Sequence, residues 1–301
     1  EGNANHRIVE KSVKIVPALF KIYDEVLTNA VDHWKRLLTH QEQGKDIKHL
    51  VTEIKVWVNK EDGEITVQNN GEGIDIVWLE EHQMYPAELI FGKLLTGTNY
   101  NLEEEKTWGG KNGYGAKLAN IFSTFFRVET VDAKRQLRLS QEYTNNMKDR
   151  TPPQIKKSKV KPFTKITFRP DFKRFGLEGL DSDTISLFQK RVYDMAAWTD
   201  RKVSVYLDGT KLTVNTFEKY VDLYLGPKDA RPRVYCKPND RWEVIATFSD
   251  DDAFQQVSFV NGICTSRGGR HVDYMCDQIK DGIVQLVKKK KKMDVKPATV
   301  K

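Results

Sequence analysis

The chain has 301 residues, of which 39% are hydrophobic and 30% are charged, enough for two medium-sized domains with separate cores. No apolar run approaches the roughly 20 residues of a membrane-spanning helix and no signal-peptide pattern is present, so we expect a soluble, intracellular protein without a membrane partner. The spacing of Cys236, Cys264 and Cys276 excludes a disulfide framework and a C-x-x-C zinc site, and we expect these cysteines to be buried.

The net charge of +7 is concentrated near the end of the chain. Residues 288–301 carry seven lysines and one aspartate, a local charge of +6, which leaves about +1 for the remainder. Five consecutive lysines, Lys288 to Lys292, are typical of a solvated, mobile segment. A localisation signal and a contact with a nucleic-acid backbone are the alternatives.

The first predicted element is a long amphipathic helix. Residues 1–16 read as a polar arm, whereas apolar residues recur at steps of three and four over residues 17–38, with a proline where a helix can begin. Glu25, Asn29 and His33 are spaced four residues apart and therefore form one polar line along this helix. Glu25 is a candidate general base for an attacking water, and the amide oxygen of Asn29 is a candidate Mg²⁺ ligand. A solvated helix face without chemistry is the alternative.

A charged loop at residues 40–48 precedes a predicted antiparallel hairpin. Its strands, residues 54–58 and 64–67, alternate in polarity and flank the turn sequence NKEDG. The second strand runs into Asn69, Asn70 and a Gly-x-Gly turn. The two carboxamides would present hydrogen-bonding edges, and either a base or an ordinary turn explains them.

A glycine-rich loop follows a predicted short helix at residues 86–95. Between them, residues 96–101 offer hydroxyl and amide groups, and residues 102–107 read as an acidic, exposed lid. Residues 108–122, WGGKNGYGAKLANIF, are a glycine-rich loop that runs directly into a helix from Ala116. Glycines and a helix N-terminus together can hold a phosphate, although an ordinary surface loop has the same composition.

The remaining elements predict two units that meet near the turn at residues 208–209. Strands that arrive in hairpins indicate an α+β first unit, with helices on one face of a mixed, mostly antiparallel sheet. A connection rich in proline and lysine is expected at residues 151–162. The expected strands are residues 127–131, 136–143, 165–169, 202–207, 242–248 and 256–260, the expected helices are residues 180–198, 217–225 and 272–287, and a glycine-rich turn is expected at residues 266–270.

Taken together, the motifs resemble the nucleotide-binding fold of the GHKL (Bergerat) ATPases, which include gyrase, MutL proteins and histidine kinases. Within that group the chain is similar, over nearly its whole length, to the N-terminal region of eukaryotic-type DNA topoisomerase II. The resemblance implies a GHKL domain at residues 1–209 and a partial transducer domain at residues 210–301. The segments that carry it are YDEVLTNAVDH (23–33), NNGEGI (69–74), LIFGKLLTGTNY (89–100), GGKNGYGAKLANIFS (109–123) and SFVNGICTSRGGRHVDY (258–274).

The resemblance implies a role for each matching residue. Glu25 would be the general base, Asn29 the Mg²⁺ ligand and Asn69 the residue that meets adenine. Thr164 fits a threonine near the base, and His33 stands where relatives have a second asparagine, so a phosphate or ribose contact is altered or pH-sensitive. The other implied nucleotide contacts are Gly97, Thr98 and Asn99 over the ribose and phosphates, and Gly110, Lys111, Asn112, Gly113, Tyr114, Gly115, Ala116 and Lys117 in the phosphate loop.

The implied function is the ATP-hydrolysing N-gate of a type II DNA topoisomerase, with ATP and Mg²⁺ as cofactors. The gate would work as a homodimer whose closure is coupled to the passage of double-stranded DNA, and Lys288, Lys289 and Lys290 fall on a cluster that meets DNA in this family. The resemblance places such a protein in the nucleus of a eukaryote, or at a cytoplasmic site of viral DNA replication.

Two further departures from the family affect these expectations. The loop at residues 40–49 is longer than in close relatives, and the sequence ends at Lys301, before the Gln-Thr-Lys loop whose lysine reaches the γ-phosphate. We therefore expect the 301-residue piece to bind ATP and hydrolyse it weakly. The alternatives are a non-catalytic, nucleotide-dependent dimerisation module and a MutL-type ATPase, and the stretch RGGRHVDY disfavours the second.

Overall fold

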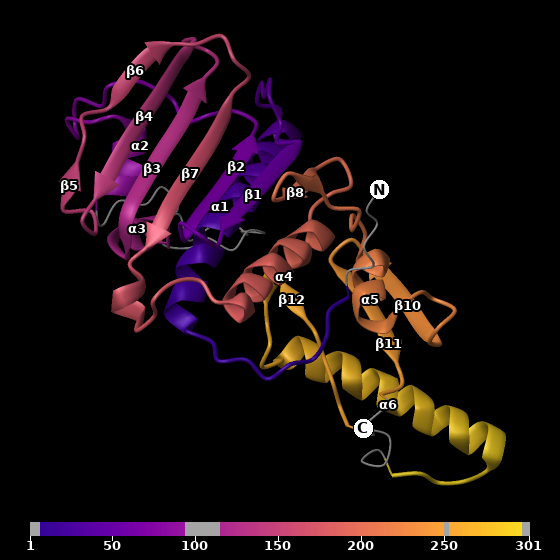
Figure 1. Cartoon of the computed structure of the whole chain (residues 1–301). Helices are drawn as coiled ribbons and strands as arrows, with labels where there is room; N and C mark the ends of the chain where they lie inside the picture. The colour runs from indigo at the N-terminus through magenta and orange to yellow at the C-terminus, as the bar shows by residue number, and fades with distance from the viewer. Residues whose placement is uncertain (1–6, 94–114, 250–252, 297–301) are drawn as a thin grey trace. The chain divides into compact units, whose positions relative to one another are not determined.

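The computed structural model describes residues 7–93, 115–249 and 253–296 (Figure 1). The chain divides into two compact units, Glu1–Tyr224 and Leu225–Lys301. The domain boundary expected at residue 209 from the family resemblance stays a prediction. The helices and strands described in the first unit are α1 (Pro17–Glu42), β1 (Glu53–Asn59), β2 (Glu64–Asn70), α2 (Pro86–Gly92), α3 (Gly115–Ile121), β3 (Ser123–Asp132), β4 (Leu137–Thr144), β5 (Asp149–Arg150), β6 (Gln154–Lys157), β7 (Phe163–Pro170), the 3₁₀-helix η1 (Phe172–Phe175), α4 (Ser182–Trp198), β8 (Ser204–Leu207), β9 (Thr210–Lys211) and α5 (Phe217–Leu225). The last residue of α5, Leu225, is the first residue of the second unit.

One mixed sheet is the frame of the first unit. Its strand order is β5-β4-β3-β7-β2-β1-β8-β9, with β6 paired to β4. The pair β1 and β8 is parallel, and the other pairs are antiparallel. Helices α1, α2 and α3 lie on one face of this sheet (Figure 1). The predicted fold class, helices on one face of a mixed, mostly antiparallel sheet, is confirmed.

The main hydrophobic core lies between the sheet and its helices. Helix α1 begins at Pro17, whose fixed φ suits the first helical turn. The rings of Tyr23 on α1 and Phe188 on α4 stack with centroids 4.1 Å apart, and those of Trp34 and Trp198 meet edge to face at 5.8 Å. The side chains that α1 buries are Leu19, Ile22, Tyr23, Val26, Leu27, Ala30, Val31, Trp34 and Leu37.

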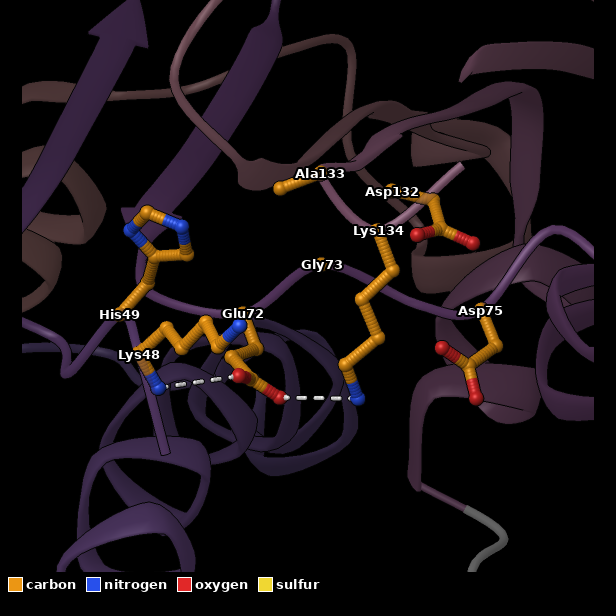
Figure 2. Close-up of a pocket in the computed structure, with 8 residues that line it drawn as sticks. All are labelled: Lys48, His49, Glu72, Gly73, Asp75, Asp132, Ala133 and Lys134. Atoms are coloured by element: carbon orange, nitrogen blue, oxygen red, sulfur yellow. Dashed lines mark hydrogen bonds and ion pairs between the residues drawn. The ribbon is translucent and has the colours of Figure 1, made fainter. Parts of the chain in front are cut away.

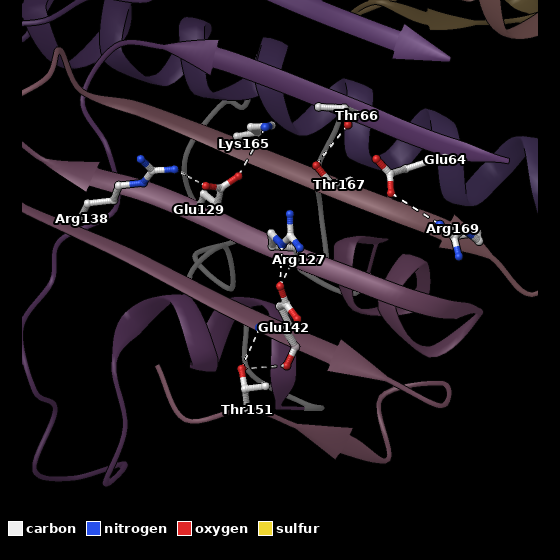
Figure 3. A network of polar contacts seen from close by, with 10 residues as sticks. All are labelled: Glu64, Thr66, Arg127, Glu129, Arg138, Glu142, Thr151, Lys165, Thr167 and Arg169. Carbon is white, nitrogen blue, oxygen red and sulfur yellow. Dashed lines mark hydrogen bonds and ion pairs between the residues drawn. The ribbon is translucent and has the colours of Figure 1, made fainter. Parts of the chain in front are cut away.

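The other face of the sheet carries paired polar side chains (Figure 3). Arg127 pairs with Glu142 across strands β3 and β4 at 2.6 Å, and Glu129 pairs with Arg138 and, at 3.4 Å, with Lys165. Burial raises the pKa of Glu129, but the hydrogen bonds and positive charges of Arg138 and Lys165 outweigh it and hold that pKa below its usual range. These cross-strand pairs hold the register of strands that the core covers on one side only.

The second unit contains two hairpins and a long helix. Strands β10 (Arg233–Asn239) and β11 (Trp242–Thr247) form one hairpin, and β12 (Phe259–Val260) and β13 (Ile263–Cys264) form the other. Helix α6 (Arg270–Lys291) buries none of its side chains among the described residues. No described helix has the length and apolarity that crossing a membrane requires.

Several predicted limits were wrong by part of an element. Helix α1 extends to Glu42 and therefore replaces the start of the loop predicted at residues 40–48. Helix α2 ends at Gly92, before the predicted limit at residue 95. The strand predicted at residues 256–260 is reduced to Phe259–Val260.

Five of the described strands were not predicted, namely β5, β6, β9, β10 and β13. The sequences of β6 and β10 resemble loops. Strand β6 lies inside the predicted connection at residues 151–162, where Ile155 is the side chain that packs toward the small core cluster of Ile76, Ala87 and Leu139. Strand β10 contains Pro238, which falls where the register with β11 shifts between Cys236 and Asn239. Proline is tolerated in strands at such irregularities.

The structure also corrects two expectations about single residue types. The lysine run is helical and not an irregular segment, because α6 continues through Lys291 and ends at Lys292 in the left-handed conformation. Positive side chains are favourable in the last turn of a helix, where carbonyl groups carry partial negative charge. The cysteines were expected to be buried, but Cys236 and Cys264 are exposed and Cys276 is partly buried.

Candidate functional site

Helix α1 presents the predicted base against the start of α3. The side chain of Glu25 is 26% exposed, and Gly115, the first residue of α3, packs directly on it. A Cβ atom at Gly115 would lie 1.9 Å from Oε2 of Glu25 and 2.5 Å from its Cδ. A side chain at position 115 would therefore require Glu25 or the start of α3 to move.

A lysine one turn earlier holds the other carboxylate oxygen of this glutamate. Nζ of Lys21 lies 2.6 Å from Oε1 of Glu25 in an i, i+4 ion pair, while the Lys21 side chain is 60% exposed. Lys21 was not among the residues predicted from the sequence, although its spacing of four residues from Glu25 is a signal for this contact. The pair engages Oε1 of Glu25 and leaves Oε2 on the side of Gly115.

The other end of the polar line on α1 contacts strand β2. Nδ2 of Asn69 donates to the backbone oxygen of Asn70 at 2.7 Å and lies 2.9 Å from Nδ1 of His33. Because the amide nitrogen only donates, Nδ1 must accept, and His33 is the neutral tautomer that carries its proton on Nε2. Burial, with a smaller contribution from the charge of Arg36, lowers the pKa of His33 to about 3.

This arrangement leaves one group of Asn69 for a ligand. Asn69 is 5% exposed, and both of its amide hydrogens have acceptors. Within the described part of the chain, its Oδ1 atom accepts no hydrogen bond. A hydrogen-bond acceptor on a buried amide suits a ligand that brings a donor, such as an amino group.

The side chain of Asn70 bonds to the protein itself, so its carboxamide does not present the free hydrogen-bonding edge for a base that the sequence left open. Its Oδ1 accepts from the backbone nitrogens of Thr52 and Glu53, both at 2.8 Å, and its Nδ2 donates to Oγ1 of Thr52 at 2.8 Å. The carboxamide therefore ties the end of β2 to the start of β1.

Thr164 lies beside Asn69 across the pair of strands β2 and β7. A buried threonine that the sequence analysis missed, Thr130 on β3, connects this position to the Gly-x-Gly turn. Its Oγ1 accepts from the backbone nitrogen of Ile74 at 2.9 Å, donates to the backbone oxygen of Phe163 at 3.1 Å and lies 3.4 Å from Oγ1 of Thr164. Thr130 thus holds the turn after β2 against the start of β7.

Three of the remaining predicted site residues, Asn29, Ala116 and Lys117, are described by the structure, and they differ in burial. Asn29 is exposed on α1, Ala116 is buried in the core, and Lys117 is 1% exposed, with its pKa lowered by burial. Lys117 therefore lies inside the fold and not on an open loop. The predicted residues Gly97, Thr98, Asn99, Gly110, Lys111, Asn112, Gly113 and Tyr114 lie outside the described residues.

A charged pocket of about 250 Å³ lies at the Gly-x-Gly turn that follows β2 (Figure 2). Glu72 spans its floor: Oε1 accepts from the backbone nitrogen of Lys48 at 3.3 Å, and Oε2 pairs with Lys134 at 3.7 Å. None of the residues on α1 lines it. The residues around it are Lys48, His49, Glu72, Gly73, Asp75, Asp132, Ala133 and Lys134.

The predicted DNA contacts belong to the second unit. Lys288, Lys289 and Lys290 are exposed in the last turns of α6, and Nζ of Lys288 pairs with Oδ1 of Asp294 at 2.8 Å. Among the described residues, no cluster of three or more His, Cys, Asp or Glu side chains is arranged to hold a metal. The exposed amide of Asn29 is a single oxygen donor, which suits a Mg²⁺ ion that keeps its waters and phosphate ligands.

Two family descriptions match the chain. "Histidine kinase-, DNA gyrase B-, and HSP90-like ATPase" matches residues 15–174, and "DNA gyrase B" matches residues 210–301. Two relatives named DNA topoisomerase 2, from Acanthamoeba polyphaga mimivirus and Bombyx mori, are each 46% identical to the chain. The alignments cover 100% and 95% of this chain but 23% and 18% of those relatives, so the chain spans about a fifth of their length.

Solved structures match the same region. The ATPase region of Saccharomyces cerevisiae topoisomerase II is 42% identical, with a TM-score of 0.84 over 96% of this chain and 72% of that one. The ATPase and transducer domains of DNA topoisomerase II from Balamuthia mandrillaris are 39% identical, with a TM-score of 0.84 over 97% and 72% of the two chains. The chain therefore belongs to the histidine kinase-, DNA gyrase B- and HSP90-like ATPases, a nucleotide-binding family, and within it to the topoisomerase II branch.

Proposed function

We propose that this chain is the ATP-binding and ATP-hydrolysing gate of a type II DNA topoisomerase. The observation that carries the proposal is the position of helix α1, which holds Glu25 against Gly115 at one end of its polar line and His33 against Asn69 at the other. His33 lies eight positions after Glu25, about 12 Å along a helix, which is comparable to the reach of a nucleoside triphosphate from its base to its last phosphate.

Adenine is the base that the Asn69 end favours. Since both amide hydrogens of Asn69 are used by Asn70 and His33, the free Oδ1 requires a donor, which the exocyclic amino group of adenine supplies. Guanine presents a carbonyl at that ring position, and two acceptors would then face each other. Thr164, which is the cross-strand partner of Asn69, is assigned to the same base edge.

Hydrolysis is assigned to the Glu25 end. The Oε2 atom on the Gly115 side accepts a proton from the attacking water, while Lys21 holds Oε1. Asn29, one turn further along α1, would hold Mg²⁺ through its amide oxygen, and the ion would neutralise charge on the phosphates. Gly110–Lys117 remains the proposed phosphate loop, and it includes Gly115, the glycine that contacts Glu25.

The roles of the whole protein follow as proposals from the relatives. ATP would stabilise a closed homodimer, and its hydrolysis would return the gate to the open form, a population shift that couples nucleotide to the passage of double-stranded DNA. Lys288, Lys289 and Lys290 are assigned to the DNA backbone. The protein would act in a nucleus or at a cytoplasmic site of viral DNA replication.

The test is the substitution Glu25→Gln in the full-length protein. A non-hydrolysable ATP analogue should bind with unchanged affinity, while phosphate release should stop. Glu178→Gln, at an exposed glutamate with no hydrogen bond or ion pair to any described residue, is the matched control and should hydrolyse normally. Unchanged turnover in Glu25→Gln would refute the assignment of the base. Nucleotide-dependent dimers of the parent protein that release no phosphate would instead favour a non-catalytic dimerisation module.

The DNA assignment has a separate test. Reversal of charge at Lys288, Lys289 and Lys290 should weaken duplex binding and flatten its dependence on salt, because fewer counterions are released from the DNA. Reversal at three exposed lysines of the first unit, Lys156, Lys157 and Lys159, controls for net charge. An equal change of the salt slope in both triple variants would argue against a specific site on α6.

A further inference from the structure

Helix α4 contacts both α1 and α5 through buried polar side chains, and it lies between these two helices in the first unit (Figure 1). The contact with α1 falls on the two residues that precede the proposed base. The contact with α5 falls on the last helix of the first unit, whose final residue, Leu225, opens the second unit.

The first contact fixes the turn of α1 that carries Glu25. Tyr23 is fully buried, and its hydroxyl donates to the backbone oxygen of Phe188 at 2.9 Å. Nε of Arg191 donates to Oδ1 of Asp24 at 2.6 Å, with side-chain exposures of 6% and 13%. Consecutive helical residues point about 100° apart, so Tyr23 and Asp24 hold α4 while Glu25 points toward Gly115.

The second contact fixes α5 on the following turn of α4. The hydroxyl of Tyr220 donates to Oδ1 of Asp194 at 2.6 Å, and Nζ of Lys190 donates to both oxygens of Asp194 at 3.0 and 3.1 Å. Because Tyr220 uses its hydrogen on the carboxylate, Tyr224 donates in the 2.8 Å contact between the two hydroxyls. The side chain of Asp194 is 3% exposed, and Tyr220 is 2% exposed.

Because the contacts between α4 and its two neighbours are polar, they fix the relative positions of these helices more strictly than apolar packing would. A buried ion pair seldom stabilises a fold more than apolar packing of equal volume would, so stability alone gives no reason for charges between these helices. Apolar side chains can slide over one another with small loss, whereas a short hydrogen bond between charged groups is lost within a small displacement. The two contacts therefore keep one relative position of α1, α4 and α5.

We propose that Arg191 positions the base Glu25 through Asp24, and that Tyr220 extends this hold through Asp194 to α5, where the second unit begins. The proposal rests on the proposed function, because it assumes that Glu25 is the base. It makes Arg191 and Tyr220 positioning residues, since neither lies among the residues assigned to the nucleotide. A displacement of α5 would move α4, and α4 would move the turn that carries Glu25.

The test compares turnover with nucleotide affinity in the full-length protein. Arg191→Lys keeps the charge but loses the planar guanidinium geometry, and Tyr220→Phe removes one hydroxyl. Each should lower kcat for ATP hydrolysis by about tenfold, because small misplacement of a catalytic group is costly, while the affinity for a non-hydrolysable ATP analogue stays constant. Tyr206→Phe is the matched control, because the Tyr206 hydroxyl makes no hydrogen bond to a described residue.

The double variant separates positioning from general destabilisation. If both residues act along one route, Arg191→Lys with Tyr220→Phe should lose no more kcat than the worse single variant. A loss equal to the product of the single losses, or kcat values unchanged at a temperature where the variants are folded, would overturn the proposal. Should the arginine variant fail to fold, the Tyr220→Phe value of kcat alone decides, since that change leaves the ring in place.

The outcome for Glu25→Gln distinguishes a failure of the positioning proposal from a failure of the proposed function. Loss of hydrolysis in Glu25→Gln with normal kcat in Arg191→Lys and Tyr220→Phe would overturn the positioning proposal and leave the proposed function intact. Retained hydrolysis in Glu25→Gln would overturn both.

Discussion

Replacement of Gly115 by alanine should reduce catalysis without unfolding the protein. Gly115 is the first residue of α3 and has no positive φ, so alanine is compatible with the backbone there. Alanine is also the better helix former, by about 1 kcal/mol in a helix interior. The penalty of the substitution should therefore come from the contact that the new methyl group makes with Glu25.

The size of that penalty follows from the geometry. The added Cβ would lie 1.9 Å from Oε2 of Glu25, whereas ordinary contact begins at 3.4 Å, so the carboxylate or the helix must shift by about 1.5 Å. A displacement of about 1 Å at a reacting group costs on the order of 100-fold in rate, which corresponds to about 2.7 kcal/mol in the activation free energy. We therefore expect kcat to fall by at least about 100-fold.

Steady-state phosphate release at saturating ATP measures this effect, and equilibrium binding of a non-hydrolysable ATP analogue shows whether the site still forms. Gly282→Ala is the matched control, because Gly282 lies in helix α6 and a Cβ there would meet nothing within 4 Å. If kcat of Gly115→Ala stayed within about twofold of the parent, the carboxylate of Glu25 would not need the position seen here, and its assignment as base would lose its geometric support.

Three further substitutions test neighbouring contacts. Lys21→Met removes the ion pair with Glu25. We expect kcat to fall by about tenfold, because the carboxylate loses a partner that helps to position it, while analogue affinity is retained. Equal kcat in the two proteins would contradict this. Since His33 has a folded-state pKa of about 3, below its unfolded value of 6.5, the stability from keeping it neutral should be full above pH 6.5 and be lost as pH falls toward 3. Urea unfolding from pH 7 to pH 4 should therefore show a loss that His33→Asn lacks, and parallel pH profiles would refute it. Thr130→Val leaves the backbone nitrogen of Ile74 without its acceptor and should lower the free energy of unfolding by about 1–3 kcal/mol, which urea titration checks; an unchanged midpoint would mean that water or another group replaces the hydroxyl.

Helices with a long apolar period could be predicted from the sequence, because one face of each packs on the core. The spacing of Leu19, Ile22, Val26 and Ala30 predicted α1, and these side chains are buried. The end of α6 was not predicted, since a run of lysines has no apolar period and yet continues a helix as well as most residues do.

Short strands such as β6 were also not predicted from the sequence, for a different reason. Lysine-rich β6 has little intrinsic strand preference, and it is a strand because β4 offers a free edge in register from Ser140 to Leu137. Such pairing depends on residues distant in sequence. Local pattern therefore carries little information about it.

The candidate site shows the same difference between residues marked by a local sequence pattern and contacts that depend on tertiary packing. Glu25, Asn29 and His33 were predicted because helical spacing puts them on one line. Asn69 was predicted from its place at a strand end before a Gly-x-Gly turn and from the family motif, and Thr164 from the family resemblance alone. Contacts that depend on tertiary packing were not found from the sequence. These are the ion pair at Lys21, the use of both Asn69 hydrogens, the bridge at Thr130 and the hold of Arg191 on Asp24.

Helix α1 meets three neighbours within three turns, and this concentration of contacts makes it the element on which the proposed chemistry depends. Glu25 faces α3 through Gly115, Asp24 faces α4 through Arg191, and His33 faces β2 through Asn69. We expect a shift of α1 that changes the contact between His33 and Asn69 to change the distance between Glu25 and Gly115 as well, because the same helix carries both residues. The proposed recognition of the base and the proposed placement of the carboxylate are therefore linked through one helix.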